Sequence, residues 1–153
     1  MIVNFITNQS PEIISGGWSG ISRNLSDALS RYAEVRIIDG IHPSVSVKAK
    51  IISKIRRLLG LKGNFHFFSE QRLDEISIQV HDQTTCADYN FFFGQTPWIH
   101  VDSEIPYGTY MDADFLTYLK VFLKPDHFIK QDIDRISQKE KSWLQGATHL
   151  FWG

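Results

Sequence analysis

Short apolar runs alternate along the chain with segments whose apolar residues recur at helical spacing. Five runs have the length and composition of buried strands, and they lie at 2–7, 35–38, 89–93, 105–111 and 148–152. Four segments return an apolar residue every three or four positions and predict helices at 19–32, 45–61, 69–80 and 126–145. This alternation predicts an α/β fold, a single three-layer Rossmann-like domain with a mainly parallel sheet.

The loop between the first strand and the first helix contains Gly16 and Gly17. In a parallel sheet, such a loop lies at the carboxyl ends of the strands, where ligands bind. Glycine allows close approach of the main chain, and the N–H groups of the following helix suit an anion such as a sugar-nucleotide diphosphate. A plain turn is the alternative interpretation.

Composition narrows the function classes. The chain has 153 residues, a length for one domain, and its 42% hydrophobic and 22% charged residues are typical of a globular protein. A formal net charge of -1 gives no support for nucleic-acid binding. The single cysteine, Cys86, excludes an intrachain disulfide and a cysteine-based metal cage. The first residues lack the pattern of a secretory signal, and no run is long enough to span a bilayer, so we expect a cytoplasmic protein.

Three segments, in this order along the chain, resemble the N-terminal domain of GT-B-fold glycosyltransferases of family 4. The first is the strand, Gly-Gly loop and helix that include residues 15–20. The second is 105–115, similar to the family's proline, short strand, aspartate and phenylalanine segment. The third is 140–153, which resembles a helix with an embedded glutamate followed by a strand.

The resemblance implies an enzyme that transfers a sugar from a nucleotide diphosphate sugar to an acceptor hydroxyl, with retention of configuration. It implies that this chain is the acceptor-side domain, 1–153, and that a C-terminal domain absent from the chain binds the nucleotide sugar. The last strand brings the chain to the binding edge and nothing follows it, so we expect a fragment. No cofactor is expected beyond the nucleotide sugar as co-substrate.

Candidate site residues follow from the same strand ends. Asp112 and Asp114 come at the carboxyl end of the fourth strand, where carboxylates can bond an acceptor's hydroxyls or position the nucleophilic oxygen. We assign the catalytic position to Asp112, with helix capping as the alternative, and Asp114 is either a binding residue or a cap or first-turn charge of a helix. Trp18 and Tyr110 are candidates for stacking on a sugar ring, although Trp18 is equally explained as a packed loop residue.

Glu140 lies on the apolar stripe of its helix, between Ile136 and Trp143. A carboxylate that faces a core needs hydrogen-bonded partners or a raised pKa. We favour a structural anchor bonded to nearby backbone N–H groups over a catalytic role. The six histidines show no paired metal-ligand spacing, so no metal is predicted. His81 with Asp82, or His100 with Asp102, is an alternative as ligands or as a base and its orienting group, and we favour scattered surface or core histidines.

Residues 48–62 hold six lysines and arginines and no acidic residue, and their isoleucines and leucines cluster on one side of a helix. Such a helix either packs its apolar face on the sheet or makes a peripheral contact with an anionic membrane. Membrane contact would suit an enzyme with a lipid-linked acceptor at the inner membrane face.

Two other functions compete with sugar transfer. A dinucleotide-binding domain would place Asp39 on the ribose, but Gly16, Gly17 and Gly20 do not have the G-x-G-x-x-G spacing. A free-standing binding or interaction domain with a Rossmann-like sheet and no catalysis has no such conflict with the sequence. We keep this second class as the alternative.

Overall fold

A computed structural model describes the chain except residues 9–10, 12–18, 45–46, 85 and 124. Five strands, all parallel, form one sheet in the order β2-β1-β3-β4-β5. They are β1 (Ile2–Ile6), β2 (Glu34–Ile38), β3 (Tyr89–Phe93), β4 (Tyr107–Met111) and β5 (His149–Trp152). The predicted α/β fold with a parallel sheet is confirmed.

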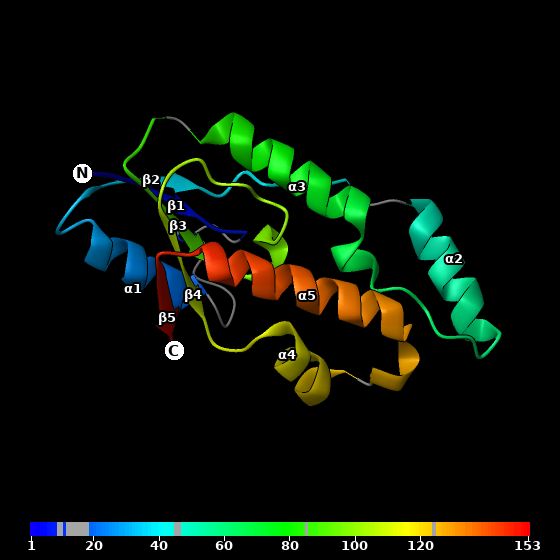
Figure 1. The fold of residues 1–153 in the computed structure, drawn as a ribbon. Helices are drawn as coiled ribbons and strands as arrows, with labels where there is room; N and C mark the ends of the chain where they lie inside the picture. The colour runs from blue at the N-terminus through cyan, green and yellow to red at the C-terminus, as the bar shows by residue number, and fades with distance from the viewer. Residues whose placement is uncertain (9–10, 12–18, 45–46, 85, 124) are drawn as a thin grey trace.

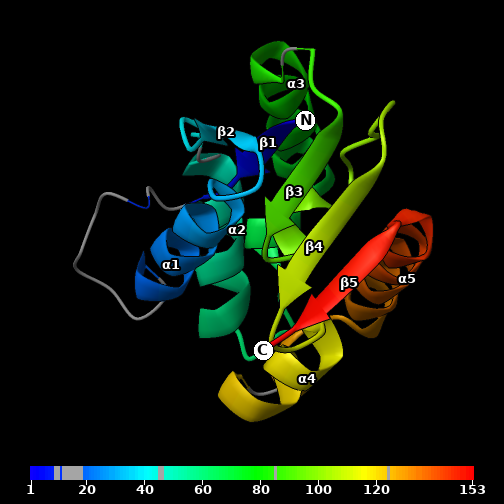
Figure 2. The ribbon, with the colours of Figure 1, turned by 90° about the vertical axis from the view of Figure 1, so that its left-hand side faces the viewer.

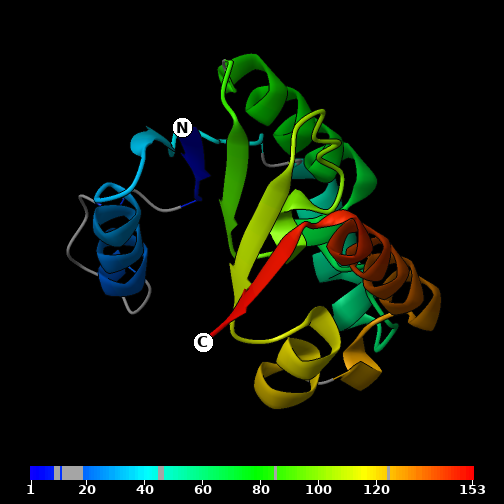
Figure 3. The ribbon, with the colours of Figure 1, turned by 60° about the vertical axis from the view of Figure 1, so that its left-hand side comes forward.

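Helices cover both faces of this sheet. They are α1 (Ser19–Leu29), α2 (Val47–Leu58), α3 (Glu70–Gln83), α4 (Phe115–Phe122) and α5 (Lys130–Gly146), with short 3-10 turns η1 (His66–Phe68), η2 (Thr96–Trp98) and η3 (Pro125–His127). Figures 2 and 3 show α1 on one side of the sheet and α3 and α5 on the other. The molecule therefore has three layers.

Alternation along the strands divides the core into two parts. Val3 and Phe5 of β1 point toward α1, where Leu25 and Leu29 pack against them. Ile6 points to the opposite face and joins the larger core, which α3, α4 and α5 cover. Because successive strand residues face opposite sides, the central strands bury apolar side chains on both faces, as expected for a parallel sheet.

The boundaries of some elements differ from those predicted. The last helix begins at Lys130 and not at 126, because η3 and a bridge between Gly63 and Phe128 occupy the preceding residues. The fourth strand begins at Tyr107, directly after Pro106, whose ring nitrogen has no hydrogen to donate to a ladder. Helix α4, expected only as a helix that starts near Asp114, extends from Phe115 to Phe122.

Pairing of β4 with β5 requires a glycine at position 108. A Cβ there would lie 2.8 Å from the backbone oxygen of His149 and closer still to the Tyr89 hydroxyl. We predict that Gly108→Ala lowers the free energy of unfolding by about 1–3 kcal/mol, because the backbone of β5 must shift. Urea denaturation measures the effect. Gly20→Ala is the control, since the described atoms leave open space there; an equal loss in both variants would contradict the steric explanation.

Candidate functional site

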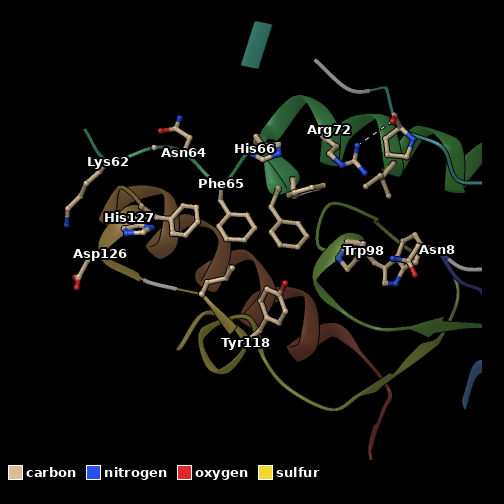
Figure 4. A pocket seen from close by; sticks show the side chains of 18 of the residues that line it. Asn8, Lys62, Asn64, Phe65, His66, Arg72, Trp98, Tyr118, Asp126 and His127 are labelled. Atoms are coloured by element: carbon tan, nitrogen blue, oxygen red, sulfur yellow. Dashed lines mark hydrogen bonds between the residues drawn. The ribbon is translucent and has the colours of Figure 1, made fainter. Parts of the chain in front are cut away.

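A cavity of about 950 Å³ lies at the carboxyl ends of the first three strands. Asn8 follows β1, Ile41 to Pro43 follow β2, and Pro97 and Trp98 follow β3, and all of them line it (Figure 4). In the sheet, β2 lies on one side of β1, and β3, the next strand along the chain, lies on the other side of β1. The cavity is therefore at the point where the strand order reverses, the position at which open α/β sheets bind ligands. We call it the switch-point pocket.

Aromatic rings form the wall of the switch-point pocket. The rings belong to Phe65, Phe67, Phe68, Trp98, Tyr118 and Phe128. Phe65 stacks on Phe68 with ring centroids 5.2 Å apart and lies 4.7 Å from the ring of Phe128. Flat apolar faces of this kind suit the apolar side of a sugar ring or a hydrocarbon chain.

Backbone hydrogen bonds fix the segment that supplies most of these rings. Gly63 donates its N–H to the carbonyl of His127 at 2.9 Å and accepts the N–H of Ile129 at 3.0 Å. The N–H of Phe65 bonds to a carboxylate oxygen of Asp132 on α5 at 2.5 Å. The wall is thus held from both ends of the 63–65 segment, so the rings need little ordering when a ligand enters.

Polar side chains surround the aromatic wall. They are His42, Lys62, Asn64, His66, Arg72, Asp126 and His127. The guanidinium of Arg72 lies 5.8 Å from the centre of the Phe67 ring and donates to the Pro43 carbonyl at 3.4 Å. Asp126 is the single carboxylate among the described lining residues. The pocket therefore offers donors and cations beside aromatic faces, a combination that fits a hydroxyl-rich or anionic ligand.

Of the residues assigned from the sequence, those that the structure describes do not line this pocket. Asp112 is exposed at the carboxyl end of β4 and is not a lining residue. Tyr110 is half-buried on the α1 face of the sheet, where its ring stacks on Phe93 at 5.6 Å, while the pocket lies on the other face. Gly16, Gly17 and Trp18 lie outside the described residues.

Asp114 caps α4. Its side chain accepts the backbone N–H of Thr117 at 2.7 Å, the hydrogen bond typical of an aspartate at a helix N-terminus. The cap interpretation is confirmed by this bond. A role in binding an acceptor stays a prediction.

Glu140 is 3% exposed and joins three segments of the chain. Its two carboxylate oxygens accept the hydroxyl of Thr96 in η2 at 2.7 Å and the N–H of Phe115, the first residue of α4, at 2.8 Å. Gln95 beside it donates to the Ala113 carbonyl. These bonds agree with the predicted structural anchor and attach α5 to the loops that follow β3 and β4.

Burial is the main cause of a raised pKa at Glu140, and the nearby Asp114 carboxylate adds to it. Hydrogen bonds from Phe115, Thr96 and Gln95 act in the opposite direction and do not cancel it. The folded protein therefore holds a proton at Glu140 over a range of pH in which the unfolded chain has lost it.

Sequence reasoning missed the aromatic wall. Residues 63–68, Gly-Asn-Phe-His-Phe-Phe, fall between two predicted helices and match neither helical nor strand periodicity. The signal that was available is composition: three phenylalanines within six residues in a connecting segment. Apolar rings in a loop that no periodicity explains indicate either a local core or a binding surface.

The described residues contain no group of three or more His, Cys, Asp and Glu side chains able to hold a metal ion. Among those same residues, no helix is long and apolar enough to cross a membrane. No protein-family model matches the chain, and it has no match among the curated proteins or the solved structures that were compared with it.

We predict that Glu140→Ala lowers the free energy of unfolding by about 2–4 kcal/mol, because it leaves the Phe115 N–H and the Thr96 hydroxyl without their acceptor. Thermal and urea denaturation measure the loss. Asp134→Ala, an exposed carboxylate on the same helix, is the matched control and should change stability by less than about 0.5 kcal/mol. Similar losses in the two variants would show that Glu140 is no anchor.

The raised pKa of Glu140 predicts a pH dependence. Its contribution to stability is complete below the unfolded pKa, near 4.5, and is lost as the pH rises through the higher pKa of the folded state. The stability of the wild type relative to Glu140→Gln should therefore fall as the pH rises above 4.5. Urea denaturation of both proteins across this range measures the difference. If the wild type instead gains stability relative to Glu140→Gln as the pH rises, burial does not raise the pKa of Glu140.

Proposed function

We propose that the chain is the acceptor-side domain of a glycosyltransferase that moves a sugar from a nucleotide diphosphate sugar to an acceptor hydroxyl. The observation that carries the proposal is the switch-point pocket. It opens at the carboxyl edge of a parallel sheet and combines aromatic faces with cationic donors. The resemblance of the three sequence segments to the GT-B fold supports the same assignment.

The proposed chemistry depends on positioning. The aromatic wall would stack on the rings or chain of the acceptor, while Arg72 and Lys62 would hold its anionic group. Fixing the acceptor in this way lowers the entropic part of the barrier to attack on the donor sugar. Stabilisation of the leaving diphosphate is assigned to a second domain and to the Gly16-Gly17 loop.

The other assigned residues belong to β4 and its carboxyl end, outside the lining of the pocket. Asp112 is proposed to position the nucleophilic oxygen, with Tyr110 and Asp114 contributing to binding. In support, Asp112 is exposed at the carboxyl end of β4, on the same edge as the pocket. The proposed location is the cytoplasm, with residues 48–62 in peripheral contact with the inner membrane face.

The second candidate function is that of a non-catalytic binding domain. One observation favours it: the carboxylate assigned to catalysis, Asp112, is absent from the lining of the pocket. In such a domain the pocket would bind its ligand without any bond being made or broken. The two candidates differ in whether Asp112 affects turnover.

Acceptor binding is tested with octyl glucoside below its critical micelle concentration, by following the intrinsic tryptophan fluorescence, to which Trp98 in the pocket wall contributes. We predict saturable binding that Phe67→Ser weakens about tenfold, because an aromatic stacking face is lost. Phe122→Ser is the matched control, since Phe122 is 69% exposed and does not line the pocket.

Four outcomes contradict parts of the proposal. Equal affinities of Phe67→Ser and Phe122→Ser would place the ligand elsewhere. Tight binding of a nucleotide diphosphate sugar to this chain alone would contradict the acceptor-side assignment. If the complete enzyme transfers sugar equally well with Asp112→Asn, Asp112 has no catalytic role, and absence of any transfer would favour the binding domain.

A further inference from the structure

Helix α2 carries an apolar stripe that the rest of the described chain leaves uncovered. The stripe consists of Ile51, Ile52, Ile55, Leu58 and Leu59. Each of these side chains is more than half exposed, and Leu58 is 79% exposed. An amphipathic helix of a globular domain ordinarily buries such a stripe against its own core. The interpretation in which this helix packs its apolar face on the sheet therefore does not hold.

The same helix and the four residues after it carry positive charge that no acidic residue of the segment balances. Residues 48–62 hold six lysines and arginines and no acidic residue, whereas the whole chain has a net charge of -1. The remaining residues therefore carry a formal charge of -7, because -1 less +6 is -7. A charge separation of this size orients the molecule in the field of an anionic surface, with the α2 end leading.

Helix α2 also occupies a suitable position in the fold. Figure 1 shows it at the end of the molecule away from both chain termini. Its chain continues through Gly60, Leu61 and Lys62, which line the switch-point pocket. A surface that contacts the α2 stripe therefore lies next to an edge of the pocket.

We infer that α2 docks on an anionic lipid bilayer, with its isoleucine and leucine stripe inserted among the acyl chains and its basic residues among the headgroups. Lys54 is exposed, and a lysine beside an apolar stripe can extend its ammonium group to the phosphates. Lipid fits better than an acidic protein surface, because the stripe joins four aliphatic side chains of a 12-residue helix to Leu59 directly after it. The inference rests on the proposed function only for the location at the inner membrane face.

Sedimentation with vesicles tests the docking directly. We expect the chain to bind vesicles of equal parts phosphatidylglycerol and phosphatidylcholine at low salt, and to bind phosphatidylcholine alone much less. Leu58→Ser should weaken the partition about tenfold, since a leucine leaves the acyl region. Lys54→Gln should weaken it about fivefold.

Matched controls lie outside α2. Tyr32→Ser removes a side chain that is 85% exposed, and Lys141→Gln removes an exposed lysine on α5; neither should change vesicle binding. Equal effects of Leu58→Ser and Tyr32→Ser would overturn the inference. So would a loss of self-association in Leu58→Ser together with no sedimentation of the wild type, because the stripe would then be a contact between copies of the chain.

A fluorescent label reports insertion without relying on a loss of binding. Cys86 is an exposed free cysteine, so Cys86→Ser gives a background for a single new cysteine. With an NBD label, Leu58→Cys should shift to shorter wavelength on anionic vesicles and Tyr32→Cys should not. No shift at position 58 while the protein sediments would show that another face holds the lipid. This result leaves the octyl glucoside measurement unaffected, so failure of docking and failure of the proposed function are separable.

Discussion

The buried carboxylate of Glu140 is the interaction on which the binding edge depends. It bonds a hydroxyl in η2 and the first N–H of α4, so one side chain of α5 attaches the segments that follow two different strands. Pro97 and Trp98 come directly after the first of these contacts, and α4 carries Tyr118 into the pocket. This convergence compensates part of the cost of burying a carboxylate, because both loops need an acceptor at the same place.

The parallel sheet supplies the rest of the arrangement. All five carboxyl ends face one edge, and the reversal of strand order between β2-β1 and β1-β3 leaves a gap there for the pocket. Trp98 packs in the larger core beneath α3 and α5. The indole N–H of Trp98 donates to the Phe93 carbonyl at 3.1 Å. The aromatic wall is therefore continuous with the core, whereas α2 extends beyond it and leaves its apolar stripe exposed.

Periodicity and strand composition were enough to predict the α/β fold, since each buried strand and each amphipathic helix has a local signal. The pocket was not predictable in this way. Phe65 and Phe128 are far apart in the sequence, and only tertiary folding brings their rings together. Glu140 was recognised because a carboxylate interrupts an apolar stripe. Tyr110 illustrates the opposite case: its strand was predicted, but pleating directs its ring to the face away from the pocket.

The central claim is that the switch-point pocket is the ligand site of this domain. Chemical-shift mapping of the ¹⁵N-labelled chain during titration with octyl glucoside tests it most directly, because every described backbone N–H reports its own surroundings. We expect the largest shifts in the residues that line the pocket, at 41–43, 60–68 and 126–128. Shifts confined to 110–114, with none at the aromatic wall, would contradict it and would place the ligand at the end of β4.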